Sequence, residues 1–210
     1  MRIAIAGAGA VGRAVALELL GNGHKVLLIE RNPDRYRPDI VPDADWLLAD
    51  ACELSTLQEA EVQNCDAVIA ASGDDKANVA VSMLAKSEFG VPRVVARVNN
   101  AGNEWLFTEA WGVDQAVSTP RAMVAAVEGA IDVGHLIRML ALRQGQSEVA
   151  KLTLDPANSL VGQRICDITL PKDTLLAAVL RDGRVIVPPS EEPLEPSDEM
   201  VFIAPREQWS

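Results

Sequence analysis

The chain has few of the residues, and none of the long apolar runs, that several functional classes require. Its 210 residues include three cysteines, two histidines and one tyrosine. A membrane-spanning helix needs about 20 apolar residues in a row, and no such run occurs. The first residues have the pattern of a strand and lack the basic and apolar segments of a signal peptide, so we expect a cytoplasmic protein.

The cysteines and the charge distribution argue against two further classes. Cys52, Cys65 and Cys166 are isolated and form no Cys-x-x-Cys pair, which favours buried free thiols over a metal or redox site. The net charge is −11, and no stripe of lysine and arginine is present to hold a phosphate backbone. We therefore expect neither a bound metal nor a nucleic-acid partner.

Groups suited to catalysis are also scarce. His24 precedes an expected strand and His135 lies in an expected helix, and neither has a carboxylate at a spacing that would orient it. Tyr36 begins no Tyr-x-x-x-Lys pair, and the chain has no nucleophile elbow, zinc-ligand set or Walker lysine. The sequence favours a ligand-binding protein over an enzyme. The alternatives are an NAD-dependent oxidoreductase or redox sensor, and a purely structural dimer.

The first part of the chain combines a strand, a glycine-rich turn, a helix and a second strand. Arg2-Ile3-Ala4-Ile5-Ala6 and the apolar residues at 26–29 predict the strands, and between them stands Gly7-Ala8-Gly9-Ala10-Val11-Gly12. In this pattern Gly7 allows the tight turn, Gly9 lets a pyrophosphate approach the backbone, and Gly12 lets the helix pack on the strand. The free N–H groups and the dipole at the helix start attract phosphates. This pattern predicts a nucleotide-binding turn.

Glu30 ends the second strand, close to the roughly 20 residues after the turn at which a carboxylate accepts hydrogen bonds from a ribose. A carboxylate at this position repels a 2′-phosphate, which favours NAD or an adenosine nucleotide over NADP. Arg31 follows directly and supports the opposite preference, because a nearby arginine can accept that phosphate.

Apolar strands and helices continue to alternate after Glu30. Further strands are expected at 46–49, 67–71, 93–98 and 113–118, with helices at 53–61, 74–88 and 103–111. This rhythm predicts an α/β fold with a Rossmann-like, doubly wound parallel sheet that is covered on both faces. Ligands then bind at the carboxyl ends of the strands.

The expected strands end in polar or small residues that would meet at that edge. Asp50, followed by Ala51, either contacts an adenine edge or caps the next helix. Ser72 and Gly73 are expected beneath the phosphates or the second ribose, with an ordinary strand-to-helix turn as the alternative. Arg97 ends an otherwise apolar strand and needs an anionic partner. A ligand phosphate is favoured there over an internal acid such as Asp114.

Residues 121–142 are predicted to form one long helix that is apolar over most of its circumference. A single sheet face cannot cover such a helix, so we expect a symmetric homodimer in which it meets its copy. This helix completes a first domain of residues 1–142.

Residues 147–210 are predicted to form a second, small α+β domain after a linker at 144–147. An alternating segment at 149–154, two segments at 174–180 and 184–187 around an Asp-Gly turn, and a closing segment at 199–204 predict at least three strands. A unit of this size is marginally stable alone, which again favours association of two copies.

Five sequence motifs, in their order along the chain, resemble the RCK/KTN regulatory subunits of bacterial potassium uptake systems, the TrkA/KtrA type. They are the glycine turn at 7–12, Leu-Ile-Glu at 28–30, Ala-Asp-Ala at 49–51, Asp-Ala-Val-Ile-Ala-Ala-Ser-Gly-Asp-Asp-Lys-Ala-Asn at 66–78 and Val-Ala-Arg-Val-Asn at 95–99. The stretch 66–78 is the most specific. The C-terminal part resembles the smaller TrkA-C domain of these proteins, through Gly162, Ile168-Thr169-Leu170-Pro171, Arg181-Asp182-Gly183 and Pro196-Ser197-Asp198-Glu199.

The resemblance implies a cytosolic gating subunit that binds NAD(H), with ATP or ADP as the alternative. It implies dimers or rings that dock at the inner face of the membrane beneath a potassium-translocating partner. It carries ligand contacts over to Gly7, Gly9, Gly12, Glu30, Asp50, Ser72, Asn78 and Arg97, and the neighbouring Ala8, Ala10, Val11, Arg31, Ala51 and Gly73 complete the candidate site. Relatives bind a cyclic dinucleotide in the C-terminal domain, where Arg164, Arg181 and Arg184 are either candidate cations or solvated surface.

Overall fold

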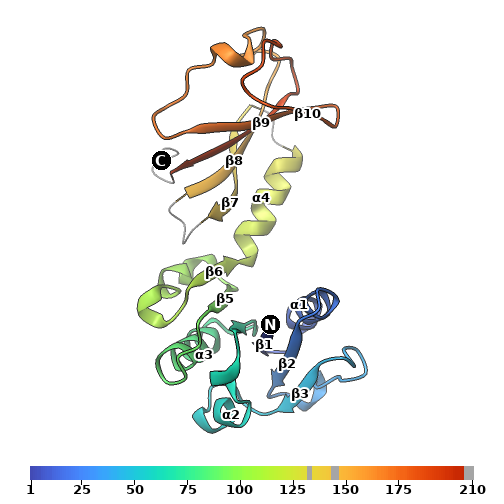
Figure 1. The fold of residues 1–210 in the computed structure, drawn as a ribbon, viewed down its shortest axis with the longest axis vertical. Helices are drawn as coiled ribbons and strands as arrows, with labels where there is room; N and C mark the ends of the chain where they lie inside the picture. Colours follow the sequence, from blue (N-terminus) through green and yellow to red (C-terminus); the bar gives the residue numbers. More distant parts are fainter. Residues whose placement is uncertain (132–133, 143–146, 206–210) are drawn as a thin grey trace. The chain divides into compact units, whose positions relative to one another are not determined.

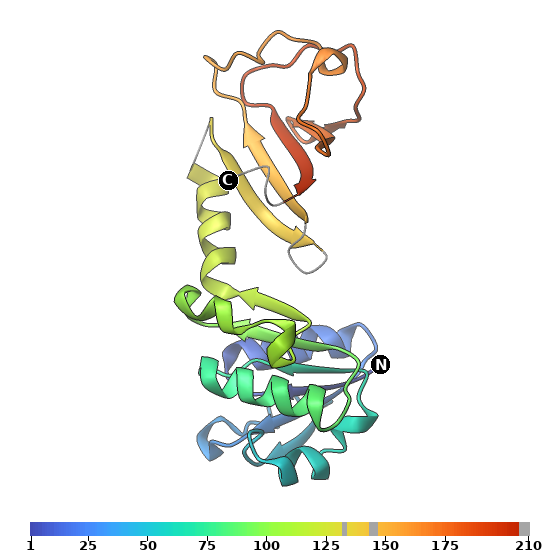
Figure 2. The same ribbon diagram turned by 90° about the vertical axis from the view of Figure 1, so that its left-hand side faces the viewer.

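The computed structural model describes residues 1–131, 134–142 and 147–205 of the chain. The chain divides into two compact units, Met1–Pro120 and Arg121–Ser210. Each unit has its own sheet (Figures 1 and 2), and each sheet has its own hydrophobic core. No helix among the described residues is both long and apolar enough to cross a membrane.

The first unit is built on a six-stranded sheet. Its strands are β1 (Arg2–Ala6), β2 (Lys25–Glu30), β3 (Asp45–Leu48), β4 (Ala67–Ala70), β5 (Val94–Val98) and β6 (Gln115–Ser118). All pairings are parallel, in the order β3-β2-β1-β4-β5-β6. The chain order reverses beside β1, which is where doubly wound sheets bind ligands. The predicted Rossmann-like sheet is confirmed.

Helices cover both faces of this sheet (Figure 1). They are α1 (Ala10–Gly21), α2 (Leu54–Glu59) and α3 (Asp75–Ser87), with short 3₁₀ helices η1 (Pro33–Arg35) and η2 (Val62–Asn64) between them. Successive strand residues point to opposite faces. Ile5 of β1 is therefore buried with Ala16 of α1, whereas Ala4 and Leu27 are buried in the cluster that contains Val81 of α3.

The helix predicted at 103–111 is wrong. The structure has two 3₁₀ helices instead, η3 (Ala101–Leu106) and η4 (Glu109–Trp111). Phe107 between them is buried in the core, and its backbone leaves the helical region at φ −91° and ψ 70°. Burial of this ring interrupts the helix, and the sequence pattern of 103–111 gives no sign of that tertiary contact.

The second unit is built on an antiparallel sheet in the order β10-β9-β11-β8-β7. Its strands are β7 (Leu136–Leu142), β8 (Ser147–Thr153), β9 (Leu175–Arg181), β10 (Arg184–Ile186) and β11 (Glu199–Pro205), with a 3₁₀ helix, η6 (Ile165–Asp167). The helix α4 (Thr119–Ile131) leads into this unit. Leu154, Leu194 and Met200 are fully buried at the centre of its core. The predicted small C-terminal domain is confirmed, with five strands in place of the minimum of three.

The single long helix predicted at 121–142 is wrong beyond Ile131. Leu136–Leu142 is a strand that pairs with β8, so the structure assigns this segment to the second sheet and not to the first domain. Gly134 has a φ of +97° and donates its N–H to Thr153 O at 2.8 Å, a backbone geometry that no helix contains. Of the predicted linker, Ser147 already begins β8, and 144–146 lie outside the described residues.

The predicted Asp-Gly hairpin is confirmed. Asp182 and Gly183 have positive φ values of 49° and 80°, and β9 pairs with β10 from Arg181 opposite Arg184. Arg181 also holds the buried Asp198 through two hydrogen bonds of 2.7 Å, from Nε to Oδ1 and from Nη2 to Oδ2. Burial alone would raise the pKa of Asp198, but these bonds and the N–H of Glu195 hold the pKa below its usual value.

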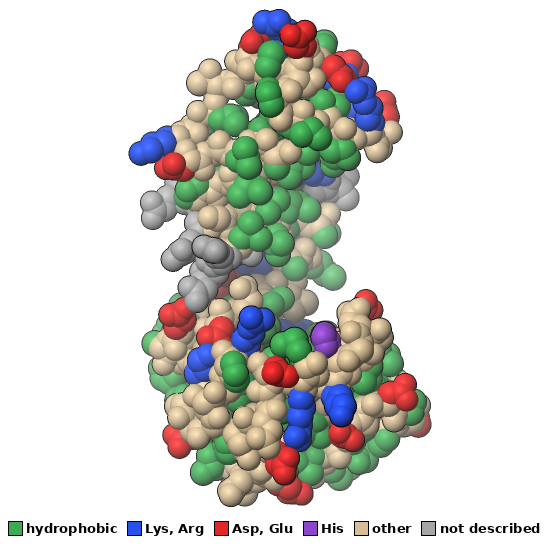
Figure 3. Space-filling view, in the orientation of Figure 1, with side chains coloured by type: hydrophobic (Ala, Val, Ile, Leu, Met, Phe, Trp, Pro, Cys, Tyr) green, Lys and Arg blue, Asp and Glu red, His purple; other side chains and the backbone are tan. Residues whose placement is uncertain are grey.

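The two units present different side chains on the face that Figure 3 shows. Figure 3 shows acidic and basic side chains interspersed over the visible face of the first unit and apolar side chains gathered on the visible face of the second. Exposed large apolar residues of the second unit include Leu140, Leu175 and Val187. Such a surface is typical of a chain that associates with other proteins.

Candidate functional site

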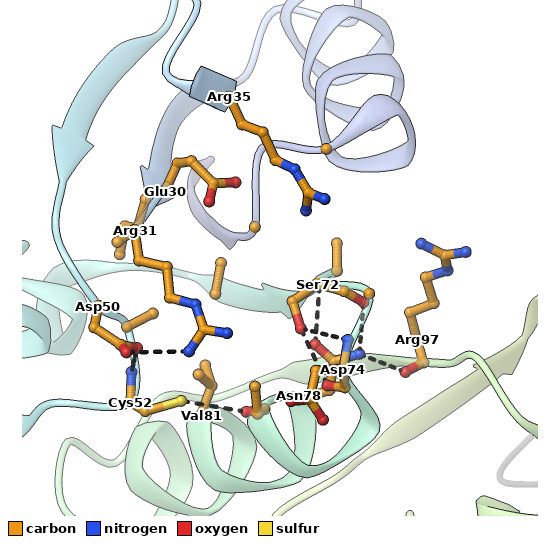
Figure 4. Close-up of a pocket in the computed structure, with 18 of the residues that line it drawn as sticks. Glu30, Arg31, Arg35, Asp50, Cys52, Ser72, Asp74, Asn78, Val81 and Arg97 are labelled. Atoms are coloured by element: carbon orange, nitrogen blue, oxygen red, sulfur yellow. Dashed lines mark hydrogen bonds and ion pairs between the residues drawn. The ribbon is translucent and has the colours of Figure 1, made fainter. Parts of the chain in front are cut away.

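A cavity of about 540 Å³ opens at the carboxyl ends of the parallel strands, at the point where the strand order reverses (Figure 4). Its volume is in the range of small-molecule and cofactor sites. Twelve of the predicted site residues line it: Gly7, Gly9, Ala10, Val11, Glu30, Arg31, Asp50, Ala51, Ser72, Gly73, Asn78 and Arg97.

Gly7 and Gly12 give the turn its shape. Gly7 has a φ of +101°, and a Cβ on it would lie 2.7 Å from the Cα of Ser72. A Cβ on Gly12 would overlap the carbonyl oxygen of Gly7. Gly12 does not line the cavity, because it is buried where α1 packs against the turn. The two residues therefore bring β1, β4 and the start of α1 closer together than other residues would allow.

Gly9 serves the cavity itself. A Cβ built on Gly9 meets nothing within 4 Å, so the space above it is open to a ligand. Gly9 is the N-cap of α1 and makes no side-chain cap, and the first turn of α1 contains no acid. The first N–H groups of a helix have no partner within the helix and carry positive partial charge. This end of the cavity suits an anion.

Glu30 is almost fully buried and connects two loops at the rim of the cavity. Its Oε2 accepts a hydrogen bond from Ala8 N at 2.8 Å, and its Oε1 accepts one from Asn32 N at 2.9 Å. Ala8 does not line the cavity but lies buried beside it. Each carboxylate oxygen has a second lone pair, so Glu30 can still accept a hydrogen bond from a ribose hydroxyl.

Asp50, Arg31 and Cys52 lie together at the β2–β3 side of the cavity (Figure 4). Asp50 Oδ1 accepts a hydrogen bond from Cys52 N at 2.9 Å, and Oδ2 lies 3.4 Å from Arg31 Nη1. The hydrogen bond from Cys52, assisted by Arg31, lowers the pKa of Asp50. Burial and the Asp50 carboxylate raise the pKa of the Cys52 thiol to about 11, so this thiol is protonated and unreactive at neutral pH.

Asn78 organises the opposite side of the cavity. Its side-chain oxygen accepts a hydrogen bond from Ser72 N, and its Nδ2 donates to Ser72 O and to Arg97 O at 3.1 and 2.8 Å. Asn78 is only 1% exposed. It joins the ends of β4 and β5 from the first turn of α3, so its amide positions the lining of the site.

Arg97 does not form the internal ion pair with Asp114 that was the alternative to a ligand phosphate. Asp114, the internal acid considered, binds Lys86 Nζ at 2.8 Å. Arg97 Nε instead donates to Thr119 Oγ1 at 3.0 Å. Among the described residues no carboxylate forms an ion pair with this guanidinium, which lines the cavity.

Sequence reasoning missed two cations, the acid Asp74 and a thiol of the site. Arg13 on the first turn of α1 donates from Nη1 to Ala8 O at 2.6 Å, and Arg35 of η1 projects toward the cavity. Arg13 directly follows the glycine turn and Arg35 lies in the connection after β2, so position at the carboxyl edge was the available signal for both. Cys52, which stands beside Ala51, could have been included for the same reason.

The site combines four arginines with three acids and few groups that could catalyse a reaction. Arg13, Arg31, Arg35 and Arg97 line the cavity with Glu30, Asp50 and Asp74. His24, His135 and Tyr36 do not line it. Within the described ranges, no cluster of three metal-ligating side chains occurs. This arrangement can bind and orient a ligand that has both hydroxyl and phosphate groups.

The three cysteines differ in burial, and the three arginines proposed as cations in the second unit are all paired. All three cysteines are free, but Cys166 is exposed and Cys52 is half-buried, so only Cys65 is a fully buried thiol as predicted. The candidate cations of the second unit are each held by a carboxylate: Arg164 by Asp167, Arg181 by Asp198 and Glu195, and Arg184 by Glu192. These pairs favour a structural role for the three arginines.

Two domain families match most of the chain. The TrkA-N domain matches residues 3–119, and the TrkA-C domain matches residues 149–209. The chain is 52% identical over 204 residues to the Trk system potassium uptake protein TrkA of Mycobacterium tuberculosis, a match that covers 97% of this chain and 93% of the relative. It is 30% identical to a TrkA homolog of Pyrococcus abyssi, over 97% of this chain and 91% of that protein.

Solved structures of RCK proteins share the fold. The GsuK RCK domain superposes with a TM-score of 0.63 at 18% identity, over 99% of this chain and 46% of that one. The GsuK channel bound to NAD superposes with a TM-score of 0.65 at 17% identity, over 99% and 38%. GsuK bound to ADP matches 62% of this chain and 33% of its own length, with a TM-score of 0.52 and 27% identity. This chain therefore spans less than half of each of these solved chains.

Proposed function

This chain belongs to the TrkA family of potassium uptake proteins, and we propose that it is a regulatory subunit that senses an adenine nucleotide. The proposed ligand is NAD(H), with ATP or ADP as the alternative. The ligand is bound and released without chemical change, and its occupancy controls a membrane-embedded potassium-translocating partner.

The cavity above the glycine turn is the observation that carries this proposal. Open space over Gly9, the free end of α1 and the buried Glu30 meet at the switch point of a doubly wound sheet. These are a phosphate-binding element and a ribose-binding element that line the same cavity, as binding of an adenosine nucleotide requires. We assign phosphate binding to the Gly9 side and ribose binding to Glu30.

The remaining lining residues extend this assignment. Asp50 and Arg31 stand beyond Glu30, where the base of the nucleotide would lie. Ser72, Gly73 and Arg97 stand on the other side of the turn, where the distal phosphate or second nucleoside would lie. The NAD and ADP named for the GsuK structures are both compatible with this order.

Regulation requires that the nucleotide bind two states of the protein with different affinities. We propose that these states belong to an oligomer. Met123, Val127 and Ile131 are each at least half exposed on one face of α4 and offer an apolar surface for a second copy. Docking to its partner would place the assembly at the inner face of the membrane.

Isothermal titration calorimetry with NAD, NADH, ATP and ADP tests the nucleotide site. At least one of the four should bind the wild-type protein. The variant Gly9→Asp should abolish binding, because it places a negative charge in open space meant for phosphate. Glu30→Gln should weaken binding about tenfold or more through loss of charged hydrogen bonds to the ribose.

The exposed Glu59→Ala on α2 is the control and should bind as the wild type does. Unaltered affinity in Gly9→Asp, or no binding of any of the four nucleotides to the wild type, would contradict the site. Steady oxidation of NADH with a small carbonyl substrate would instead support an oxidoreductase.

A further inference from the structure

Arg97 both lines the cavity and contacts Thr119. It lies next to last in β5, lines the cavity, and is half-buried. Its Nε donates to Thr119 Oγ1 at 3.0 Å, while no carboxylate among the described residues pairs with its guanidinium. Figure 4 shows this guanidinium extended away from Asp74. The N–H groups of its two terminal nitrogens therefore remain for an anion in the cavity.

The backbone on both sides of this contact is held in place. Asn78 Nδ2 fixes the carbonyl of Arg97 at 2.8 Å, and Arg97 pairs with Val117 across the β5–β6 ladder. Thr119 directly follows Ser118, the last residue of β6, and its hydroxyl lies 3.0 Å from Arg97 Nε. The Arg97 side chain thus reaches Thr119 without displacement of either strand.

Thr119 is the first residue of α4, and α4 continues across the boundary between the two units at Pro120 and Arg121. We propose that Arg97 is a positioning residue that couples occupancy of the cavity to the start of α4 through Thr119. This inference rests on the proposed nucleotide site. The group that Arg97 recognises is the anionic distal part of the nucleotide, a phosphate oxygen beyond the one held at Gly9.

The chemistry of arginine makes both contacts possible together. The guanidinium is a planar fork, so Nε can donate to the hydroxyl while the terminal nitrogens donate to a phosphate. A bound phosphate holds the plane of the fork and thereby the direction of the Nε–H bond. The first turn of α4 is then more ordered in the bound state than in the free state. Lysine has a single charged nitrogen and cannot keep this geometry.

Hydrogen–deuterium exchange of the full chain, measured with and without saturating nucleotide, tests the coupling. NADH and ATP are the probes, each at a concentration at which calorimetry shows saturation. In the wild type, nucleotide should slow exchange in peptides from 119–131 about fivefold. Thr119→Val has nearly the same shape and should bind the nucleotide within about threefold of the wild type, but it should lose this protection.

Thr119→Ser restores the hydroxyl and should restore the protection. The coupling is wrong if Thr119→Val protects 119–131 as the wild type does, or if the serine variant behaves like valine. A Thr119→Val variant that loses binding more than tenfold would also overturn it, because Thr119 would then belong to the binding site. A wild-type protein that binds neither probe would contradict the proposed function itself, which separates the two failures.

Discussion

At the scale of single residues, packing contacts decide which glycines of α1 can be replaced. Gly12 and Gly21 both belong to α1, but they differ in their surroundings. A Cβ on Gly12 would overlap the Gly7 carbonyl, whereas a Cβ on Gly21 would meet nothing within 4 Å. The glycine at 12 is therefore required by packing, and the glycine at 21 is not.

We expect Gly12→Ala to destabilise the first unit by about 1–3 kcal/mol, because the backbone of the turn must move. Gly21→Ala should be neutral or should stabilise by up to about 1 kcal/mol, since alanine favours helix and restricts the unfolded chain. Urea unfolding followed by tryptophan fluorescence measures both, because three of the four tryptophans, Trp46, Trp105 and Trp111, lie in the first unit. Equal effects of the two substitutions would contradict the packing role of Gly12.

The start of α3 shows how one short element can organise several loops. Asp75 accepts hydrogen bonds from Asn99 N and Nδ2, Asn100 N and Asn103 Nδ2, at 2.7 to 3.0 Å. Burial raises the pKa of Asp75, but the bonds from Asn99, Asn103 and Asn100 outweigh it and hold the pKa below its usual value. The neighbouring Asp74 caps the helix through Lys76 N and is exposed.

Asp75→Asn should destabilise the first unit by about 1.5–3 kcal/mol, because an amide cannot accept from all these donors. Asp74→Asn should be nearly neutral, since asparagine caps a helix as well as aspartate does. Denaturant unfolding at pH 7 distinguishes the two.

Because the pKa of Asp75 is lowered, its contribution to the free energy of unfolding depends on pH. Its stabilisation is complete above the unfolded value of about 3.9 and is lost as the pH falls through the lower folded value. The difference in stability between wild type and Asp75→Asn should therefore shrink below about pH 4. A difference that is constant from pH 7 to pH 2.5 would rule out this role of the carboxylate.

The chain as a whole has an apolar surface that its own fold does not cover. Met123 and Ile131 on α4 are 68% and 76% exposed, and Val124 and Val127 lie on the same side of the helix. The predicted helix was longer than the observed one, yet its apolar face persists within Thr119–Ile131. Association of two copies through α4 remains the economical way to cover this face.

Ile131→Glu should shift the protein from dimer or higher oligomer toward monomer or aggregate in sedimentation velocity. The reason is that burying an unpaired carboxylate at the contact costs more than the apolar area gains. Glu128→Gln, an exposed neighbour on the same helix, is the control and should leave the assembly unchanged. A soluble, monodisperse dimer of Ile131→Glu would show that this face is not the interface.

Much of the first unit could be predicted because its signals are local. Buried parallel strands appear as apolar runs, and the glycine turn at 7–12 directly follows the first of them, with Gly12 required by the Gly7 carbonyl of the same turn. Twelve of the fourteen predicted site residues line the cavity, because the carboxyl ends of parallel strands converge on one edge. Ala8 and Gly12 lie behind it because the turn folds inward at these positions.

Other features depended on contacts between distant parts of the chain. The segment 136–142 has an apolar pattern that fits a helix or a buried strand, and only pairing with β8 makes it a strand. The partner of Arg97 could not be predicted from the sequence. Asp114 forms its ion pair with Lys86, and the pairing of β5 with β6 brings Thr119 within reach of Arg97.

The amino-acid pattern alone therefore specified the parallel sheet, the glycine turn, the acid at position 30 and the Asp-Gly hairpin, since the signal for each of their parts is contained in a short stretch of sequence. Folding in three dimensions decided where α4 ends, which strand borders the second sheet, and which groups Asn78, Asp75 and Arg97 hold. Antiparallel pairing and side-chain hydrogen bonds join residues far apart in the chain, and competition among several donors for one acceptor is settled only when all of them are in place.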